Sequence, residues 1–254
     1  MNNKTQSSSA KEESLKQAVI NCFRQHKGAY GRIRIKKALA PKGIHLSEWK
    51  IAQILEENNL HAKCGRKRSY KKPVKTEEEI IRENLLLNNK ELITHCQKND
   101  VWSSDITRIQ TKTGILYLAG ILDISTRKLL GYRIDHHQRQ EIVHEAIEMA
   151  VLKKPADKEV IFHSDRGTQY TANRTQALLH QHRLKSSMSR PGKPNDNQYI
   201  ESFWRSLKVE IGKMTTYTSK ESKRILLEYC NQYNAHRLHS SIGYKTPSEM
   251  YAQS

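Results

Sequence analysis

The chain has 254 residues, and its mean hydropathy of −0.79 makes it very polar. A chain of this length forms one or two domains. Its apolar runs fall far short of the roughly 20 residues that a transmembrane helix needs, which excludes such a helix. Lys and Arg number 44 against 26 Asp and Glu, giving a net charge of +18 and a pI near 9.7, and this favours a polyanionic partner such as nucleic acid.

The N-terminal part of the chain is predicted to be helical. Residues 1–12 are polar and rich in serine, and we expect a disordered tail without the apolar segment of a secretory signal, hence a cytoplasmic protein. Over 13–62, apolar residues recur at helical spacing, and Pro41 and Gly43 separate two short helices. Ser47 is the expected N-cap of the second helix, whose apolar stripe is Ile51, Ile54 and Leu55. This pattern is typical of a DNA-binding helix-turn-helix.

A strongly basic segment follows. Residues 61–75 carry seven Lys or Arg and no acid, so they either track DNA phosphates or form a solvated linker. We assign residues 63–97 to a basic linker and a connecting helix. The DNA contacts expected from this segment are Arg66, Lys67, Arg68, Lys71 and Lys72.

From residue 98 to 254 the pattern changes to strands alternating with helices. Three strand-like runs in succession, within 101–134, predict a meander, and helix and strand then alternate up to the helix at 197–210. The order β-β-β-α-β-α-β-α predicts a mixed five-stranded sheet with helices on both faces, the order of the RNase H-like fold.

Three carboxylates stand at informative places in this pattern. Asp105 lies within the first strand, Asp165 ends the fourth, and Glu201 lies one turn into a helix. A carboxylate in an apolar strand is costly to bury unless it is paired or metal-bound, and hard oxygen ligands suit Mg²⁺ or Mn²⁺. Any one of them could equally be an ordinary surface or capping carboxylate. Asp123 also ends a strand, and spacing alone does not reject it.

Longer motifs identify a resemblance. The stretches VWSSDITRI, GILYLAGILDISTRKLLGYRI, FHSDRGTQYTA, SMSRPGKPNDNQYIESFWRSLKVE and YNAHRLHSSIGYKTPSEM follow one another in the chain. In this order they resemble the catalytic (OrfB) protein of bacterial insertion-sequence transposases of the IS-three family, which has a retroviral-integrase-like core. The resemblance covers roughly residues 28–250 and includes the helix-turn-helix region.

The resemblance implies roles for particular residues. Asp105, Asp165 and Glu201 correspond to the catalytic DDE carboxylates, which would hold two Mg²⁺ or Mn²⁺ ions. Thirty-five residues separate Asp165 from Glu201, and Lys208 follows seven residues after Glu201. On a helix Asn197, Glu201, Arg205 and Lys208 share one face. Expected DNA contacts on this face are Lys208, Arg205 and Asn197. We also expect a DNA contact from Arg166, and the resemblance implies a DNA or intersubunit contact from Arg237.

Two further residues have more than one interpretation. His163, just before Asp165, either acts near the scissile phosphate or shapes the end of the strand, and we favour the second. Trp204 either stacks on a DNA base or packs in the core, and again we favour the second.

The implied function is metal-dependent DNA cleavage and strand transfer at the ends of an insertion element. The implied partners are double-stranded DNA, further copies of the chain on DNA, and the product of an upstream reading frame (OrfA) as a separate or fused chain, in a nucleoid-associated bacterial protein. Two alternatives stay open: a nuclease of the same fold that hydrolyses without joining, and a helix-turn-helix regulator without catalysis.

Overall fold

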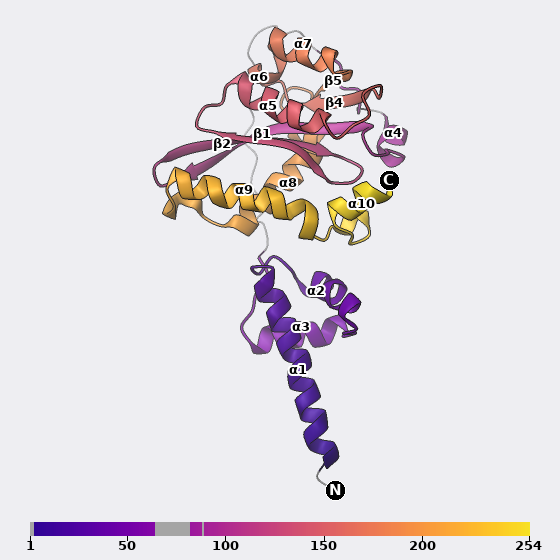
Figure 1. Cartoon of the computed structure of the whole chain (residues 1–254), viewed down its shortest axis with the longest axis vertical. Coiled ribbons are helices and arrows are strands. Elements are labelled where there is room, and N and C mark those ends of the chain that lie inside the picture. Colours follow the sequence, from indigo (N-terminus) through magenta and orange to yellow (C-terminus); the bar gives the residue numbers. More distant parts are fainter. Residues whose placement is uncertain (1–2, 64–81, 88) are drawn as a thin grey trace. The chain divides into compact units, whose positions relative to one another are not determined.

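The computed structural model describes residues 3–63, 82–87 and 89–254. The chain divides into two compact units, residues 1–67 and 68–254, and each is described by itself (Figure 1). The basic segment predicted to contact DNA lies mostly outside the described residues.

The first unit consists of helices. These are α1 (Asn3–Gln25), α2 (Arg32–Leu39), a short 3-10 turn η1 (Ala40–Lys42) and α3 (Glu48–Glu57). α1 includes residues 3–12, which the sequence analysis expected to be a disordered tail. The chain has no glycine or proline before Gly28, so nothing in the covalent backbone stops the amphipathic helix at 13–25 from continuing toward the N-terminus.

The predicted helix break and the predicted N-cap of this unit are confirmed. Gly43 follows η1 with a left-handed φ of 73°, and the Ser47 hydroxyl accepts a hydrogen bond from the backbone N–H of Lys50 at the start of α3. The predicted apolar stripe of α3 is buried, and so are residues of α1 and α2, namely Val19, Phe23, Ile35 and Leu39. Three helices thus share one small core.

The second unit is built on a five-stranded sheet (Figure 1). Its strands are β1 (Val101–Thr111), β2 (Gly114–Asp123), β3 (Leu129–Asp135), β4 (Val160–Ser164) and β5 (Leu184–Met188), in the spatial order β3-β2-β1-β4-β5. The first three strands form an antiparallel meander, while β4 pairs with β1, and β5 with β4, in parallel. The predicted mixed sheet is confirmed.

Helices cover the sheet on both faces. They are α5 (Gln140–Val151), α6 (Thr168–Thr171), α7 (Asn173–Gln181), α8 (Gln198–Ile211), α9 (Ser219–His236) and α10 (Pro247–Gln253). Before the sheet, α4 spans only Lys90–Thr94, so the connecting helix expected in 63–97 is a single short turn in the described residues. Among the described residues, no helix combines the length and apolar character needed to cross a bilayer.

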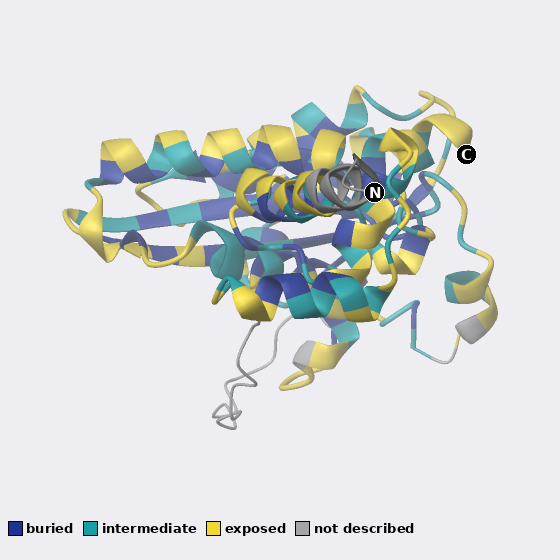
Figure 2. Cartoon of the chain, turned by 90° about the horizontal axis from the view of Figure 1, so that it is seen from below, coloured by how far each residue is buried: buried dark blue, intermediate teal, exposed yellow. Residues whose placement is uncertain are grey.

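Two apolar clusters fill the space between the helices and the sheet. One contains Trp102 and Ile121 with the buried face of α5, and the other contains Leu116 and Leu118 with the buried faces of α8 and α9. Figure 2 shows buried residues along the strands and exposed residues along the outer sides of the helices. Because side chains alternate along a strand, β1, β2 and β3 supply both clusters, whereas β4 and β5 contribute to the first of these two.

Candidate active site

The parallel pairing of β1 with β4 brings two aspartates together. Their register sets Ser103 opposite His163, so Asp105 and Asp165 each lie two residues further along neighbouring strands. Asp165 follows the last residue of β4, at the carboxyl end of the strand, where functional groups of open α/β sheets gather. The backbone N–H of Gly167 donates to Asp165 Oδ1 at 2.9 Å and holds the carboxylate at the start of the turn.

Helix α8 brings the third carboxylate to the same edge. Glu201 lies in the first turn of α8. Just before this helix, the side-chain amide of Asn197 donates to the carbonyl oxygen of Ser104 at 2.9 Å and accepts from the Ser103 hydroxyl. The start of α8 is therefore tied to β1 next to Asp105.

The three carboxylates line one cleft of about 320 Å³. Cationic side chains of the turn after β4 and of the loop after β5 line it as well, so the cleft contains Asp105, Asp165, Glu201, Arg166, Arg190 and Lys193. Acidic and basic side chains in one cleft are the combination expected where metal ions and phosphates meet.

The electrostatics of the cleft couple the carboxylates. Burial, together with the negative charges of Asp165 and Glu201, raises the pKa of Asp105 to about 7, while hydrogen bonds from Ile106 and Trp204 act in the opposite direction. Burial also raises the pKa of Asp165, opposed by the hydrogen bond from Gly167. Burial and nearby negative charge both disfavour the ionised form of a carboxylic acid, and a cation bound in the cleft would favour it.

The donor set fits a hard divalent ion. All three candidate ligands are carboxylates, and neither histidine nor cysteine is among the described residues that line the cleft, which suits Mg²⁺ or Mn²⁺ rather than a softer metal. Within the described residues, no group of three His, Cys, Asp or Glu side chains is gathered tightly enough to enclose an ion. The carboxylates thus share a cleft and influence one another without being closed around a common point.

A tryptophan supports the first of these carboxylates. The indole N–H of Trp204, on α8, donates to Asp105 Oδ2 at 2.9 Å, and the Trp204 side chain is buried in the core between α8 and the sheet. The preference for core packing over base stacking is confirmed. The hydrogen bond to Asp105 was not predicted, because sequence spacing does not reveal which strand residue faces a helix.

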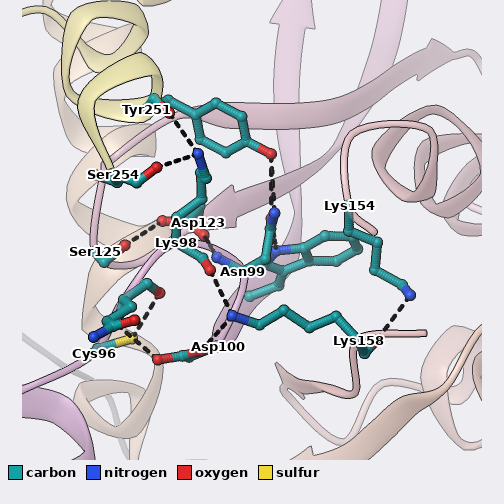
Figure 3. A network of polar contacts seen from close by, with 12 residues as sticks. Cys96, Lys98, Asn99, Asp100, Asp123, Ser125, Lys154, Lys158, Tyr251 and Ser254 are labelled. Atoms are coloured by element: carbon teal, nitrogen blue, oxygen red, sulfur yellow. Dashed lines mark hydrogen bonds and ion pairs between the residues drawn. The ribbon is translucent and has the colours of Figure 1, made fainter. Parts of the chain in front are cut away.

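Asp123 and His163 are internal residues. Asp123 is fully buried and accepts hydrogen bonds from the backbone N–H of Asn99 and from the Ser125 hydroxyl (Figure 3). It also accepts from the backbone N–H and the hydroxyl of Thr126. His163 is fully buried between the hydroxyls of Ser187 and Ser189, and burial lowers its pKa to about 4. A neutral His163 therefore shapes the end of β4, as the sequence analysis favoured.

The residues expected to contact DNA lie in different places. Arg166 lines the cleft, where its Nε–H donates to the Ser189 carbonyl oxygen, and Arg205 is exposed on α8. Lys208 lines a second hollow, with Arg108 and Gln110. The expected contacts of the basic segment, namely Arg66, Lys67, Arg68, Lys71 and Lys72, lie outside the described residues.

Two of the expected DNA contacts are turned inward. Asn197 is buried and occupied with β1. Arg237 is also buried, and its guanidinium donates to Glu210 at 2.9 Å, to the Ser206 hydroxyl at 3.1 Å and contacts the His239 ring nitrogen at 2.9 Å. Arg237 therefore links the end of α9 to α8 instead of presenting a surface cation, because its buried charge needs the Glu210 carboxylate.

Two cations of the cleft were not predicted, Arg190 and Lys193. Arg190 pairs with Asp196 through two hydrogen bonds of 2.9 Å, which, together with Asn84, lower the pKa of Asp196 to about 2. These contacts give the loop between β5 and α8 a defined course across the cleft. The only sequence signal was the Gly-, Pro- and Lys-containing composition of residues 186–196.

Known protein families match most of the chain. Residues 95–194 and 182–247 each match an integrase core domain family, and residues 10–68 match an HTH-like domain family. The structure of the simian T-cell lymphotropic virus intasome in complex with PP2A regulatory subunit B56 gamma contains a chain with the same fold. Its TM-score is 0.53 at 16% sequence identity, covering 85% of this chain and 70% of that one. The five-stranded unit is thus an RNase H-like integrase core.

Curated relatives extend along nearly the whole chain. The transposase for insertion sequence element IS904 of Lactococcus lactis is 34% identical over 239 residues, which cover 93% of both chains. Transposase InsF for insertion sequence IS3A of Escherichia coli is 33% identical over 235 residues, covering 91% of this chain and 80% of the relative. The chain therefore belongs to the IS3 family of insertion-sequence transposases, with an HTH-like domain ahead of an integrase core.

Proposed function

We propose that this protein cuts DNA at the ends of an insertion element and joins the freed 3′-hydroxyl to a second phosphodiester. The observation that carries the proposal is the single cleft that Asp105, Asp165 and Glu201 line together with cationic side chains. Family membership makes the protein a polynucleotidyl-transferase-type enzyme. The two-ion mechanism and the residues that serve it are part of the proposal.

The three carboxylates would hold two Mg²⁺ or Mn²⁺ ions. Bound there, such ions activate an attacking oxygen and stabilise the leaving oxygen in phosphoryl transfer. Arg166, Arg190 and Lys193 would hold the DNA phosphates at the mouth of the cleft, where bidentate and point-charge contacts to phosphate are favourable. The chain's main task is then to position DNA and to neutralise charge.

No side chain is required as a nucleophile. Tyr170 is the tyrosine nearest in sequence to Asp165, but it is fully buried, its hydroxyl is bonded to the Ser104 hydroxyl, and burial raises its pKa well above 10. Water would attack in the cleavage step and the 3′-hydroxyl of DNA in the joining step.

We also propose a division of labour along the chain. Residues 13–62 would bind the element ends, residues 63–97 would connect the two parts and contact the DNA backbone, and residues 98–254 would carry out the chemistry. Pairing two element ends requires at least two copies of the chain on DNA. An upstream-frame (OrfA) product, separate or fused, would supply further contacts.

The test is plasmid nicking and joining with Mg²⁺ or Mn²⁺. Asp105→Asn, Asp165→Asn and Glu201→Gln are expected to abolish both reactions while DNA binding, measured by gel shift, is retained. Asp157→Asn, which changes an exposed aspartate of a loop, is the matched control and should leave both reactions unchanged. Near-full strand transfer by any of the three cleft variants would refute the site, and nicked products that are never joined would indicate a nuclease.

A further inference from the structure

The side chain of Trp204 lies over Gly120 of β2 and donates its N–H to Asp105 on the neighbouring strand β1. Asp105 on β1 lies opposite Gly120 on β2, and the indole of Trp204 comes from α8, above this pair. A Cβ atom built on Gly120 would lie 2.7 Å from Cη2 and 3.1 Å from Cζ2 of the indole. Contacts this short are not tolerated between rigid groups, so the indole can occupy this place only above a glycine.

Aromatic neighbours also confine the indole. The Phe203 ring packs against it with a centroid separation of 4.8 Å, and Phe203 in turn meets the Tyr233 ring edge-to-face at 4.7 Å. Trp204 itself is only 3% exposed. A buried ring confined by a strand and by aromatic neighbours has one rotamer available, so the direction of its N–H is fixed.

We propose that Trp204 is a positioning residue that aims the Asp105 carboxylate at the divalent ion, and that Gly120 is the residue that makes room for it. This inference rests on the proposed metal-dependent function. A hydrogen bond from outside the ligand shell fixes the orientation of a ligand, and its loss commonly costs 10- to 100-fold in metal affinity. Trp204 lies three residues after Glu201 on α8, so the helix that carries the third ligand also orients the first.

The test measures Mn²⁺ binding to the full-length protein by isothermal titration calorimetry, without DNA and without turnover. Trp204→Phe keeps an aromatic ring but removes the N–H, and we expect Mn²⁺ affinity to fall about tenfold. Gly120→Ala should produce a similar loss, because the methyl group displaces the indole, and it should also lower the melting temperature.

The double variant Gly120→Ala/Trp204→Phe distinguishes positioning from general damage. The smaller phenylalanine ring leaves space for the methyl group, so the double variant should regain the melting temperature lost in Gly120→Ala. Its Mn²⁺ affinity should be no weaker than that of Trp204→Phe alone. Fully additive losses of affinity would contradict the proposal, because two residues that act through one hydrogen bond cannot each lose it independently.

A second buried tryptophan provides the matched control. Trp102 donates its N–H to Asn99 and belongs to the opposite core cluster, so Trp102→Phe should leave Mn²⁺ affinity unchanged. If Trp204→Phe also binds Mn²⁺ like the wild type, the positioning role is refuted. The variant Asp105→Asn tests the metal site separately from the positioning role of Trp204. Unchanged Mn²⁺ binding in Asp105→Asn would refute the proposed metal site itself.

Discussion

Asp105 and Asp123 lie on neighbouring central strands, but their hydrogen-bond partners give them different roles. Asp105 faces the cleft and accepts a hydrogen bond from the Trp204 side chain, and burial, together with two nearby carboxylates, raises its pKa. Asp123 is surrounded by donors from the backbone and from hydroxyl groups. A carboxylate whose acceptor sites are filled by the protein serves the fold, whereas one that adjoins other carboxylates suits a cation.

Asp123→Asn is expected to reduce stability without removing the chemistry. In asparagine an NH₂ group replaces one of the two acceptor oxygens, so the donors that faced this oxygen lose their acceptor. We expect the free energy of unfolding to fall by about 3 kcal/mol, the scale of hydrogen bonds to a buried charged group. Urea-induced unfolding measures this loss, and plasmid nicking by the folded protein at 25 °C should stay within about twofold of the wild type. A variant that is as stable as the wild type but inactive would place Asp123 in the active site instead.

His163 predicts how stability depends on pH. Its pKa falls from 6.5 to about 4 in the fold because the ring is buried, so below pH 6.5 the unfolded chain takes up a proton that the folded chain does not. Stability attributable to His163 is therefore lost as the pH falls from 6.5 toward 4, by about 2 kcal/mol at pH 5. The wild type should lose unfolding free energy between pH 7.5 and pH 5, and in His163→Gln this loss should be smaller by about 2 kcal/mol. A loss of the same size in the variant would contradict this account.

At the scale of elements, α8 contributes both a carboxylate of the candidate site and buried residues of the core. Its first turn carries Glu201, and residues along its inner face, Ile200, Phe203, Trp204 and Leu207, are buried against the sheet. Side-chain bonds from Asn197 and Trp204 attach it to β1 on either side of Glu201. The placement of the third carboxylate therefore depends on how this helix packs.

The contact between α8 and α9 gives a prediction about Arg237. Arg237→Ala would leave the Glu210 carboxylate without its buried partner, and we expect a loss of about 3–5 kcal/mol in unfolding free energy. The salt dependence of DNA affinity should not change, whereas removal of a phosphate contact lowers the slope by about one. Lys193→Ala, at the cleft, is the comparison variant in which that lower slope is expected; a lower slope in Arg237→Ala would restore it as a DNA contact.

At the scale of the whole molecule, each of the two compact units has buried apolar residues of its own. We expect a fragment of residues 68–254 to fold and to nick DNA with Mn²⁺, but to lose preference for element ends. A fragment of residues 1–67 should bind DNA without metal. Circular dichroism and gel shifts with element-end and unrelated DNA measure these properties, and an unfolded 68–254 fragment would show that the core depends on the first unit.

The sequence by itself determined the order of the strands and helices, because alternation and helical periodicity are local properties. It also determined the candidate carboxylates, because the contiguous motifs around Asp105, Asp165 and Glu201 carry the family resemblance, whereas spacing alone did not reject Asp123. The start of α1 was missed, because a polar composition that lacks Gly and Pro permits both a helix and a tail.

Only the tertiary structure decided which polar residues face the cleft. Arg237 and Asn197 are residue types that often contact DNA. In the fold they are buried instead, because Asn197 bonds to β1 and Arg237 links the end of α9 to α8. Arg190 and Lys193 reach the cleft through a loop whose course depends on Asp196 and Asn84. The pairing of Gly120 with Trp204 joins residues 84 positions apart. Such relations arise from packing between distant segments, and local periodicity contains no information about them.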